Sequence, residues 1–152
     1  MMPATTARVE ENTNDTVNER IERHTIRNIA SAVRRGAIDL RLKQLDEEWD
    51  IERVLETNAA SISLIGPGLG AVISRRLFVI PAIVAGFLLQ HAIQGWCPPV
   101  PAFRRLGIRT AREIEAERYA LKVIRGDFEE YRQAEREVTE SRIKRILEVT
   151  RR

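Results

Sequence analysis

The sequence predicts an all-α chain in which a membrane helical hairpin is flanked by two long, charged, amphipathic helical arms. Two observations lead to this prediction. The only charged residues between Asn58 and Gln94 are Arg75 and Arg76, whereas both flanks carry a charge at every second or third position. Apolar residues in the flanks recur at spacings of mostly three to five, as they do on one face of a helix. The 31% charged and 43% hydrophobic residues are therefore segregated along the chain rather than mixed.

The first arm follows a polar start. We expect residues 1–15, which are rich in Thr, Asn and Glu, to be disordered. Residues 16–57 form the N-terminal helical arm, with a break or bend at Arg34-Arg35-Gly36. A break is expected there because glycine inside a helix costs about 1 kcal/mol relative to alanine. A second helical stretch, residues 37–57, would then lead into the apolar segment.

Residues 58–97 are the predicted two-helix membrane hairpin. Its segments, Asn58–Ser74 and Leu77–Gln94, would each be about 26 Å long, close to the roughly 30 Å hydrocarbon core of a bilayer. The two arginines between them leave room only for a tight turn, so the helices should be antiparallel. A helix that is apolar on all sides must be buried in lipid or in protein. The charged arms offer only narrow apolar stripes, which favours lipid over a buried hairpin in a soluble bundle.

Aromatic and cationic residues at the ends of the hairpin predict where the bilayer ends. The expected membrane-interface residues are Trp49, Arg53, Arg75, Arg76, Trp96, Arg104 and Arg105. Within about twenty residues of the hairpin the two flanks carry seven basic residues, against two in the turn. The positive-inside rule therefore predicts a protein of the bacterial inner (cytoplasmic) membrane with both termini in the cytoplasm. The expected partners are the lipid bilayer and either other membrane-protein subunits or further copies of the chain.

A connector and a second arm follow the hairpin. Residues 98–109 are a Pro- and Arg-rich connector, and residues 110–152 form the C-terminal helical arm. Thr110 and Glu113 match the capping box, in which each side chain accepts a hydrogen bond from the other residue's backbone amide. Apolar residues then follow heptad spacing for three heptads, which is marginal for a coiled coil. We expect this helix to pack against the first arm or against a partner.

Two stretches, Leu45–Ala59 and Phe87–Gly107, resemble a known family. They are similar to small bacterial inner-membrane proteins of unknown function whose two-helix transmembrane module, the YgaP-like domain, also occurs behind rhodanese sulfurtransferase domains. The matching positions are Arg53, Asn58, Gly95, Cys97, Pro98, Leu106 and Gly107. The resemblance implies a two-helix membrane module over roughly Leu45–Gly107. It does not imply sulfurtransferase activity, because the sequence lacks the catalytic loop of that domain.

Few residues suggest catalysis. Cys97 is the only cysteine and His91 is one of two histidines, so we expect no metal site, no cofactor and no enzymatic activity. An alternative is thiol-dependent sulfur (persulfide) handling, in which Cys97 and His91 would be the catalytic residues. A thiol at a helix C-terminus, however, lacks the helix N-terminus that lowers the pKa of reactive cysteines.

A soluble helical nucleic-acid-binding protein is the second alternative, because the basic residues are mostly arginine, which binds phosphate well. Nearly every arginine, however, has an Asp or Glu within four positions. Such a pattern is typical of a solvated helix face, so we expect no nucleic-acid partner. The sequence favours a non-enzymatic accessory or scaffold subunit of a larger membrane complex, with respiratory and photosynthetic complexes among the candidates.

Overall fold

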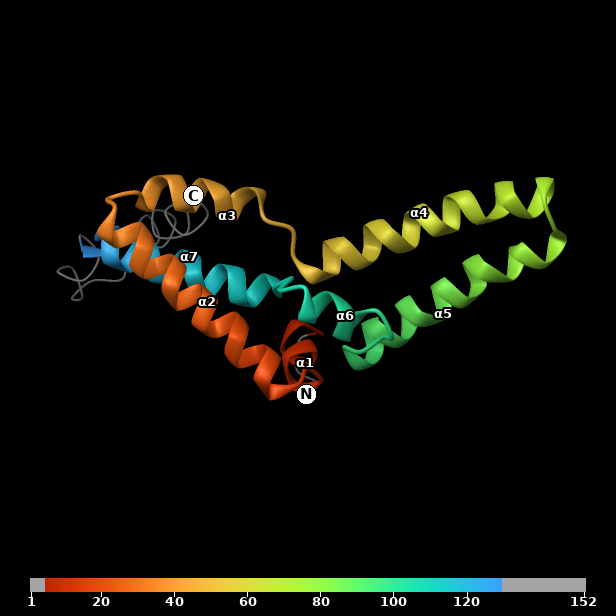
Figure 1. The fold of residues 1–152 in the computed structure, drawn as a ribbon, viewed down its shortest axis with the longest axis horizontal. Coiled ribbons are helices and arrows are strands. Elements are labelled where there is room, and N and C mark those ends of the chain that lie inside the picture. The colour runs from red at the N-terminus through yellow and green to blue at the C-terminus, as the bar shows by residue number, and fades with distance from the viewer. Residues whose placement is uncertain (1–4, 130–152) are drawn as a thin grey trace, which may run out of the picture.

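The chain divides into a bundle of helices and a long hairpin that projects from it (Figure 1). The computed structural model describes residues 5–129, and this part of the chain contains helices and no strand, so the all-α prediction is confirmed. The elements in chain order are α1 (Thr5–Glu11), α2 (Asp15–Arg34), α3 (Ile38–Glu47), α4 (Ile51–Val72), the 3₁₀ helix η1 (Arg75–Phe78), α5 (Val79–Gln94), α6 (Val100–Arg105) and α7 (Ala111–Arg125).

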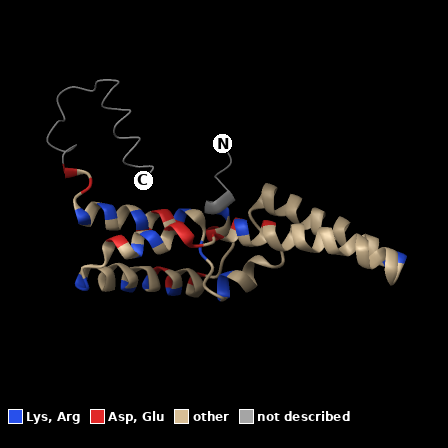
Figure 2. Ribbon diagram, turned by 90° about the horizontal axis from the view of Figure 1, so that it is seen from above, with Lys and Arg blue, Asp and Glu red and all other residues tan. Residues whose placement is uncertain are grey.

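The bundle is formed chiefly by α2, α3 and α7, with charged residues spread over its helices (Figure 2). Its core contains Ala32 of α2, Leu42 and Leu45 of α3, and Ile114 and Leu121 of α7. The predicted break between α2 and α3 is confirmed, and Gly36 adopts a positive φ of 61° there. A chain reversal at this point requires a left-handed residue, which glycine supplies without a Cβ clash.

The second arm begins as the sequence predicts. Both hydrogen bonds of the capping box between Thr110 and Glu113 are present at the start of α7. Helix α7 ends at Arg125, whereas the predicted heptad pattern continues beyond this residue. The part of that pattern from residue 130 onward lies outside the described residues.

Three sequence-based boundaries differ from the structure. Residues 5–11 form α1 rather than a disordered start, because Val9 is fully buried against the base of the hairpin. The expected continuous helix over 37–57 is interrupted after Glu47, because Asp50 caps a new helix by accepting a hydrogen bond from the Arg53 amide at 2.7 Å. Within the predicted connector 98–109, residues 100–105 form α6.

The hairpin consists of α4 and α5, which are antiparallel as expected (Figure 1). Two glycines of α4 allow the helices to approach closely near the turn. A Cβ on Gly66 would lie 3.0 Å from Pro81 Cγ, and one on Gly70 would lie 3.2 Å from the Phe78 ring. Larger residues at these positions would push the two helices apart.

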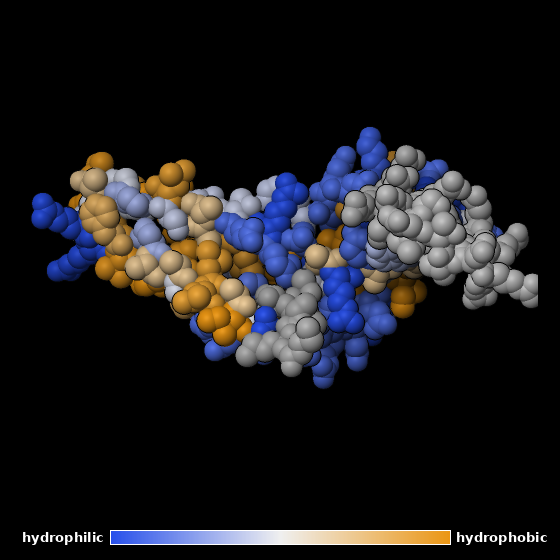
Figure 3. Space-filling view, turned by 180° about the vertical axis from the view of Figure 1, so that it is seen from behind, coloured by the Kyte–Doolittle hydropathy of each residue, from blue (hydrophilic) through white to orange (hydrophobic). Residues whose placement is uncertain are grey.

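The apolar side chains of the hairpin face outward. Those that are exposed are Ile62, Leu64, Ile65, Leu69, Val72, Ile73, Phe78, Val79, Ile80, Ile83, Phe87, Leu89 and Ile93. Figure 3 shows apolar surface gathered over the hairpin and hydrophilic surface over the bundle. No other described segment covers this apolar surface.

The prediction of two spanning helices is corrected, because only one segment within residues 5–129 is a candidate membrane span. The segment Arg75–Gln94 is long and apolar enough to cross a membrane, and only 6% of its 18-residue apolar stretch is buried within the protein. Helix α4 does not meet the same criterion. Its first turns carry Glu52, Arg53 and Glu56, and the part from Ala59 onward has no charged residue but includes two serines.

Candidate functional site

The expected membrane-interface residues lie at both ends of the hairpin. Arg75 and Arg76 are exposed at its tip, visible as the basic end of the projecting helices in Figure 2. At the base, the Arg53 guanidinium lies 4.2 Å from the centre of the Trp49 ring, a cation–π contact. Trp49 is half exposed, Trp96 is partly buried and Arg105 is exposed.

Arg104 does not lie at a surface, contrary to the sequence-based prediction. Its side chain is fully buried and forms a bidentate pair with Glu113, at 2.6 and 2.8 Å. It also donates to Asn18 Oδ1 at 2.9 Å and to the Ile108 carbonyl at 3.2 Å. A guanidinium committed to these partners inside the protein cannot reach a lipid head group.

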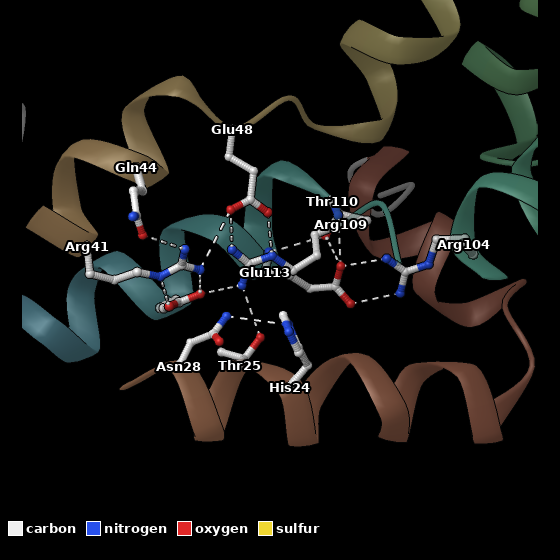
Figure 4. A network of polar contacts seen from close by, with 11 residues as sticks. His24, Thr25, Asn28, Arg41, Gln44, Glu48, Arg104, Arg109, Thr110 and Glu113 are labelled. Carbon is white, nitrogen blue, oxygen red and sulfur yellow. Dashed lines mark hydrogen bonds and ion pairs between the residues drawn. The ribbon is translucent and has the colours of Figure 1, made fainter. Parts of the chain in front are cut away.

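A second buried arginine connects three segments of the bundle (Figure 4). The guanidinium of Arg109 donates to both oxygens of Glu48, each at 2.7 Å, and to Thr25 Oγ1 of α2 at 3.0 Å. It also donates to Glu117, whose side chain is fully buried on α7. Arg41 of α3 approaches the same carboxylate at 2.7 and 3.0 Å. We refer to Arg41, Glu48, Arg109 and Glu117 as the ion-pair cluster.

The carboxylates of Glu117, which is buried, and of Glu113, which is partly exposed, are held in their charged forms. Burial alone would raise the pKa of Glu117, but hydrogen bonds from Arg41 and Arg109 outweigh it and lower that pKa. Burial likewise opposes ionisation of Glu113, and its hydrogen bonds with Arg104 and Thr110 lower its pKa below the usual value. Each carboxylate therefore keeps its charge at neutral pH and holds α7 against neighbouring segments.

Sequence reasoning missed this cluster for a definite reason. It assigned the arginines to local pairs on solvated helix faces, and a few such pairs occur, for example between Arg118 and Glu115 at 3.0 Å. Arg41 and Glu117, however, are 76 positions apart in the chain. Only the packing of α3 on α7 brings them together, and no local spacing signals it.

Cys97 lies inside an apolar cluster at the base of the hairpin. Its side chain is 2% exposed and packs with Val9, Ile51, Leu55 and Val100. Burial raises the pKa of the Cys97 thiol, and a backbone hydrogen bond involving Val100 only partly opposes this. A buried thiol with a raised pKa has little thiolate and little access to reagents.

His91 and Glu52 are polar groups at the same end of the hairpin. His91 is 6% exposed in the last turn of α5, and neither ring nitrogen has a hydrogen-bond partner among the described residues. Both oxygens of the Glu52 carboxylate, in the first turn of α4, are likewise buried without such a partner. Burial raises the pKa of Glu52, and the neighbouring carboxylates of Asp50 and Glu56 raise it further. Within residues 5–129, no group of three His, Cys, Asp or Glu side chains is placed to hold a metal ion.

Helix α1 closes the base of the hairpin. The Arg8 guanidinium donates to the carbonyls of Ile93 at 2.6 Å and Ala92 at 3.3 Å, which are among the last carbonyls of α5. A cation at this position also complements the negative end of the helix dipole. The N-terminal helix therefore fastens the hairpin to the bundle.

The chain was compared with family models, with curated proteins and with solved structures, and no match was found in any of the three. The resemblance to the two-helix transmembrane family therefore stays a prediction that rests on the short motifs of the sequence.

Proposed function

We propose that this chain is a non-enzymatic protein of the bacterial inner membrane, in which the α4–α5 hairpin enters the bilayer and the helical bundle stays at its surface. The observation that supports the proposal most strongly is the exposure of large apolar side chains along the hairpin. Leaving such a surface in water is unfavourable by about 25 cal/mol per Å². The segment Arg75–Gln94 is the proposed span, and the apolar part of α4 packs beside it.

The distribution of exposed charge supports an orientation with the bundle in the cytoplasm. Lys43, Arg53, Arg105 and Arg112 are exposed on the bundle or at the hairpin base. The tip carries only Arg75 and Arg76, whose long side chains can extend into the far head-group layer. In this proposal both termini lie on the cytoplasmic side, together with the bundle.

A role as an accessory or scaffold subunit follows from the rigid connection between bundle and hairpin. The ion-pair cluster joins α3 to α7, Arg109 also donates to Thr25 of α2, and Arg8 fastens the end of α5. A bundle whose helices are held together in this way presents a defined surface to partner subunits of a larger membrane complex. The burial of Cys97 favours this role over sulfur handling, which requires an accessible thiolate.

Carbonate extraction of cell membranes tests the membrane proposal. The full-length chain should stay in the membrane pellet. Leu64→Arg, on the hairpin, should weaken retention, because a cation inside the hydrocarbon costs about 3 kcal/mol. Leu106→Arg is the matched control, since Leu64 and Leu106 are 82% and 77% exposed and Leu106 lies outside the hairpin. Recovery of the wild-type chain as a soluble, monodisperse species without detergent would refute the proposal.

Purification of the full-length chain from native membranes in mild detergent tests the scaffold role. Co-purifying membrane subunits present in fixed stoichiometry are the expected result. A chain that elutes alone as a monomer at its native level of expression would contradict the scaffold role while leaving the membrane proposal intact.

A further inference from the structure

We propose that a basic pocket between α2 and the α6–α7 loop binds a phosphate group. The pocket has a volume of about 280 Å³, and none of its lining residues is acidic. Arg20, His24 and Arg27 line it from α2, Arg104 and Arg105 line it from α6, and Arg109 lines it from the loop before α7.

The cations of this pocket fall into two groups. The charges of Arg104 and Arg109 are compensated by the carboxylates of Glu113, Glu48 and Glu117. Arg20, Arg27 and Arg105, in contrast, are exposed and have no ion-pair partner among the described residues. The first group is structural, and the second is available to a ligand.

The spacing of the available arginines suits one shared anion. Arg20, His24 and Arg27 are separated by four and three residues on α2, so they lie on one face of that helix. Arg105 approaches from a different element and lines the same pocket. Bringing like charges together without a counter-ion is unfavourable, and an anion removes that cost. The planar guanidinium group of arginine can donate two parallel hydrogen bonds to phosphate oxygens. A phosphate group therefore fits this lining better than an apolar ligand does.

The position of the pocket favours a lipid as the source of the phosphate. Arg105 ends α6, the first helix after the hairpin, and α6 packs on α4 at the hairpin base. If the hairpin is inserted, Arg105 at the end of α6 lies near the head-group layer, and this part of the inference rests on the proposed function. Binding of phosphate itself does not depend on insertion, and a soluble phosphate ester would make the same contacts.

A pair of matched double variants tests the site. Arg20→Gln/Arg27→Gln removes two charges that line the pocket, and Arg23→Gln/Arg34→Gln removes two exposed charges from the same helix that do not line it. The full-length chain in neutral detergent micelles is titrated with inorganic phosphate, with chloride at equal ionic strength as the reference. Binding is followed by the NMR signals of the arginine Nε–H groups.

The expected result is saturable phosphate binding that is at least about tenfold weaker in Arg20→Gln/Arg27→Gln and unchanged in Arg23→Gln/Arg34→Gln. Equal losses in both variants, or no saturable binding in the wild type, would overturn the proposal. A second arm uses phosphatidylcholine nanodiscs with and without phosphatidylglycerol. A pocket-specific loss there identifies the lipid source, and a loss confined to inorganic phosphate identifies a soluble phosphate ligand. Failure of the chain to enter nanodiscs would contradict membrane insertion and not phosphate binding.

Discussion

Replacing Glu117 by glutamine removes the central carboxylate of the ion-pair cluster. Glu117 is fully buried and accepts hydrogen bonds from Arg41 and Arg109, whose side chains are 18% and 4% exposed. Glutamine keeps the size of the side chain, but its amide group places N–H donors against two guanidinium groups. The variant therefore leaves the buried guanidinium of Arg109 and the partly buried guanidinium of Arg41 with less compensation.

The expected loss of stability depends on the ion pairs that remain in the variant. Breaking a buried ion pair from one side costs about 3–5 kcal/mol. Glu48 still pairs with Arg109 at 2.7 Å and with Arg41 at 3.8 Å, which places the expected loss near about 3 kcal/mol. For a chain of this length that corresponds to a Tm lower by roughly 6–12 °C.

Thermal unfolding followed by circular dichroism in mild detergent measures this loss. Glu115→Gln is the matched control on the same helix, because Glu115 is 47% exposed and pairs with Arg118 at the surface. The control should lose no more than about 0.5 kcal/mol. Equal Tm values for Glu117→Gln and Glu115→Gln would refute the structural role of the cluster.

Three further predictions concern other parts of the molecule. Glu113 and Glu117 have lowered pKa values in the folded state, so the stability they contribute is present above about pH 4.5, the ordinary pKa, and is lost as the pH falls through their folded pKa values. The Tm should therefore drop on acidification. A Tm that does not change with acid would contradict this. Glu52 has a raised pKa, so its contribution to stability increases on acidification, but this single group opposes the two carboxylates of Glu113 and Glu117. Cys97 should react with a soluble disulfide reagent at least about a hundredfold more slowly in the folded chain than in denaturant, whereas equal rates would mean that the thiol is accessible. Arg8→Gln should reduce stability by about 1 kcal/mol and raise amide hydrogen exchange at the end of α5, and unchanged exchange there would argue against the capping contact.

Features with local signals could be predicted from the sequence. The bend at Gly36 and the capping box of Thr110 and Glu113 each depend on a few neighbouring residues, and both are present. The antiparallel hairpin also follows from a local feature, because two apolar segments are separated only by Arg75 and Arg76. Helix propensity, caps and hydrophobic periodicity act over short distances along the chain, so a single sequence contains them.

Features created by tertiary packing could not be predicted. The polar start of the chain gives little indication that Val9 fills a core at the hairpin base. Arg104 lies beside an exposed basic residue in the sequence, yet packing turns it inward to Glu113. The basic pocket likewise combines arginines of α2 and α6 that are far apart in the chain.

The most direct test of the central claim, insertion of the hairpin into lipid, is a spin label at Leu64. The label is attached to Leu64→Cys in a Cys97→Ala background, and the full-length chain is reconstituted into liposomes. Leu64 is 82% exposed on the hairpin, so insertion predicts frequent collisions of the label with oxygen, which dissolves in lipid, and few with a water-soluble nickel complex. Frequent collisions with the nickel complex, as in bulk water, would contradict the membrane account.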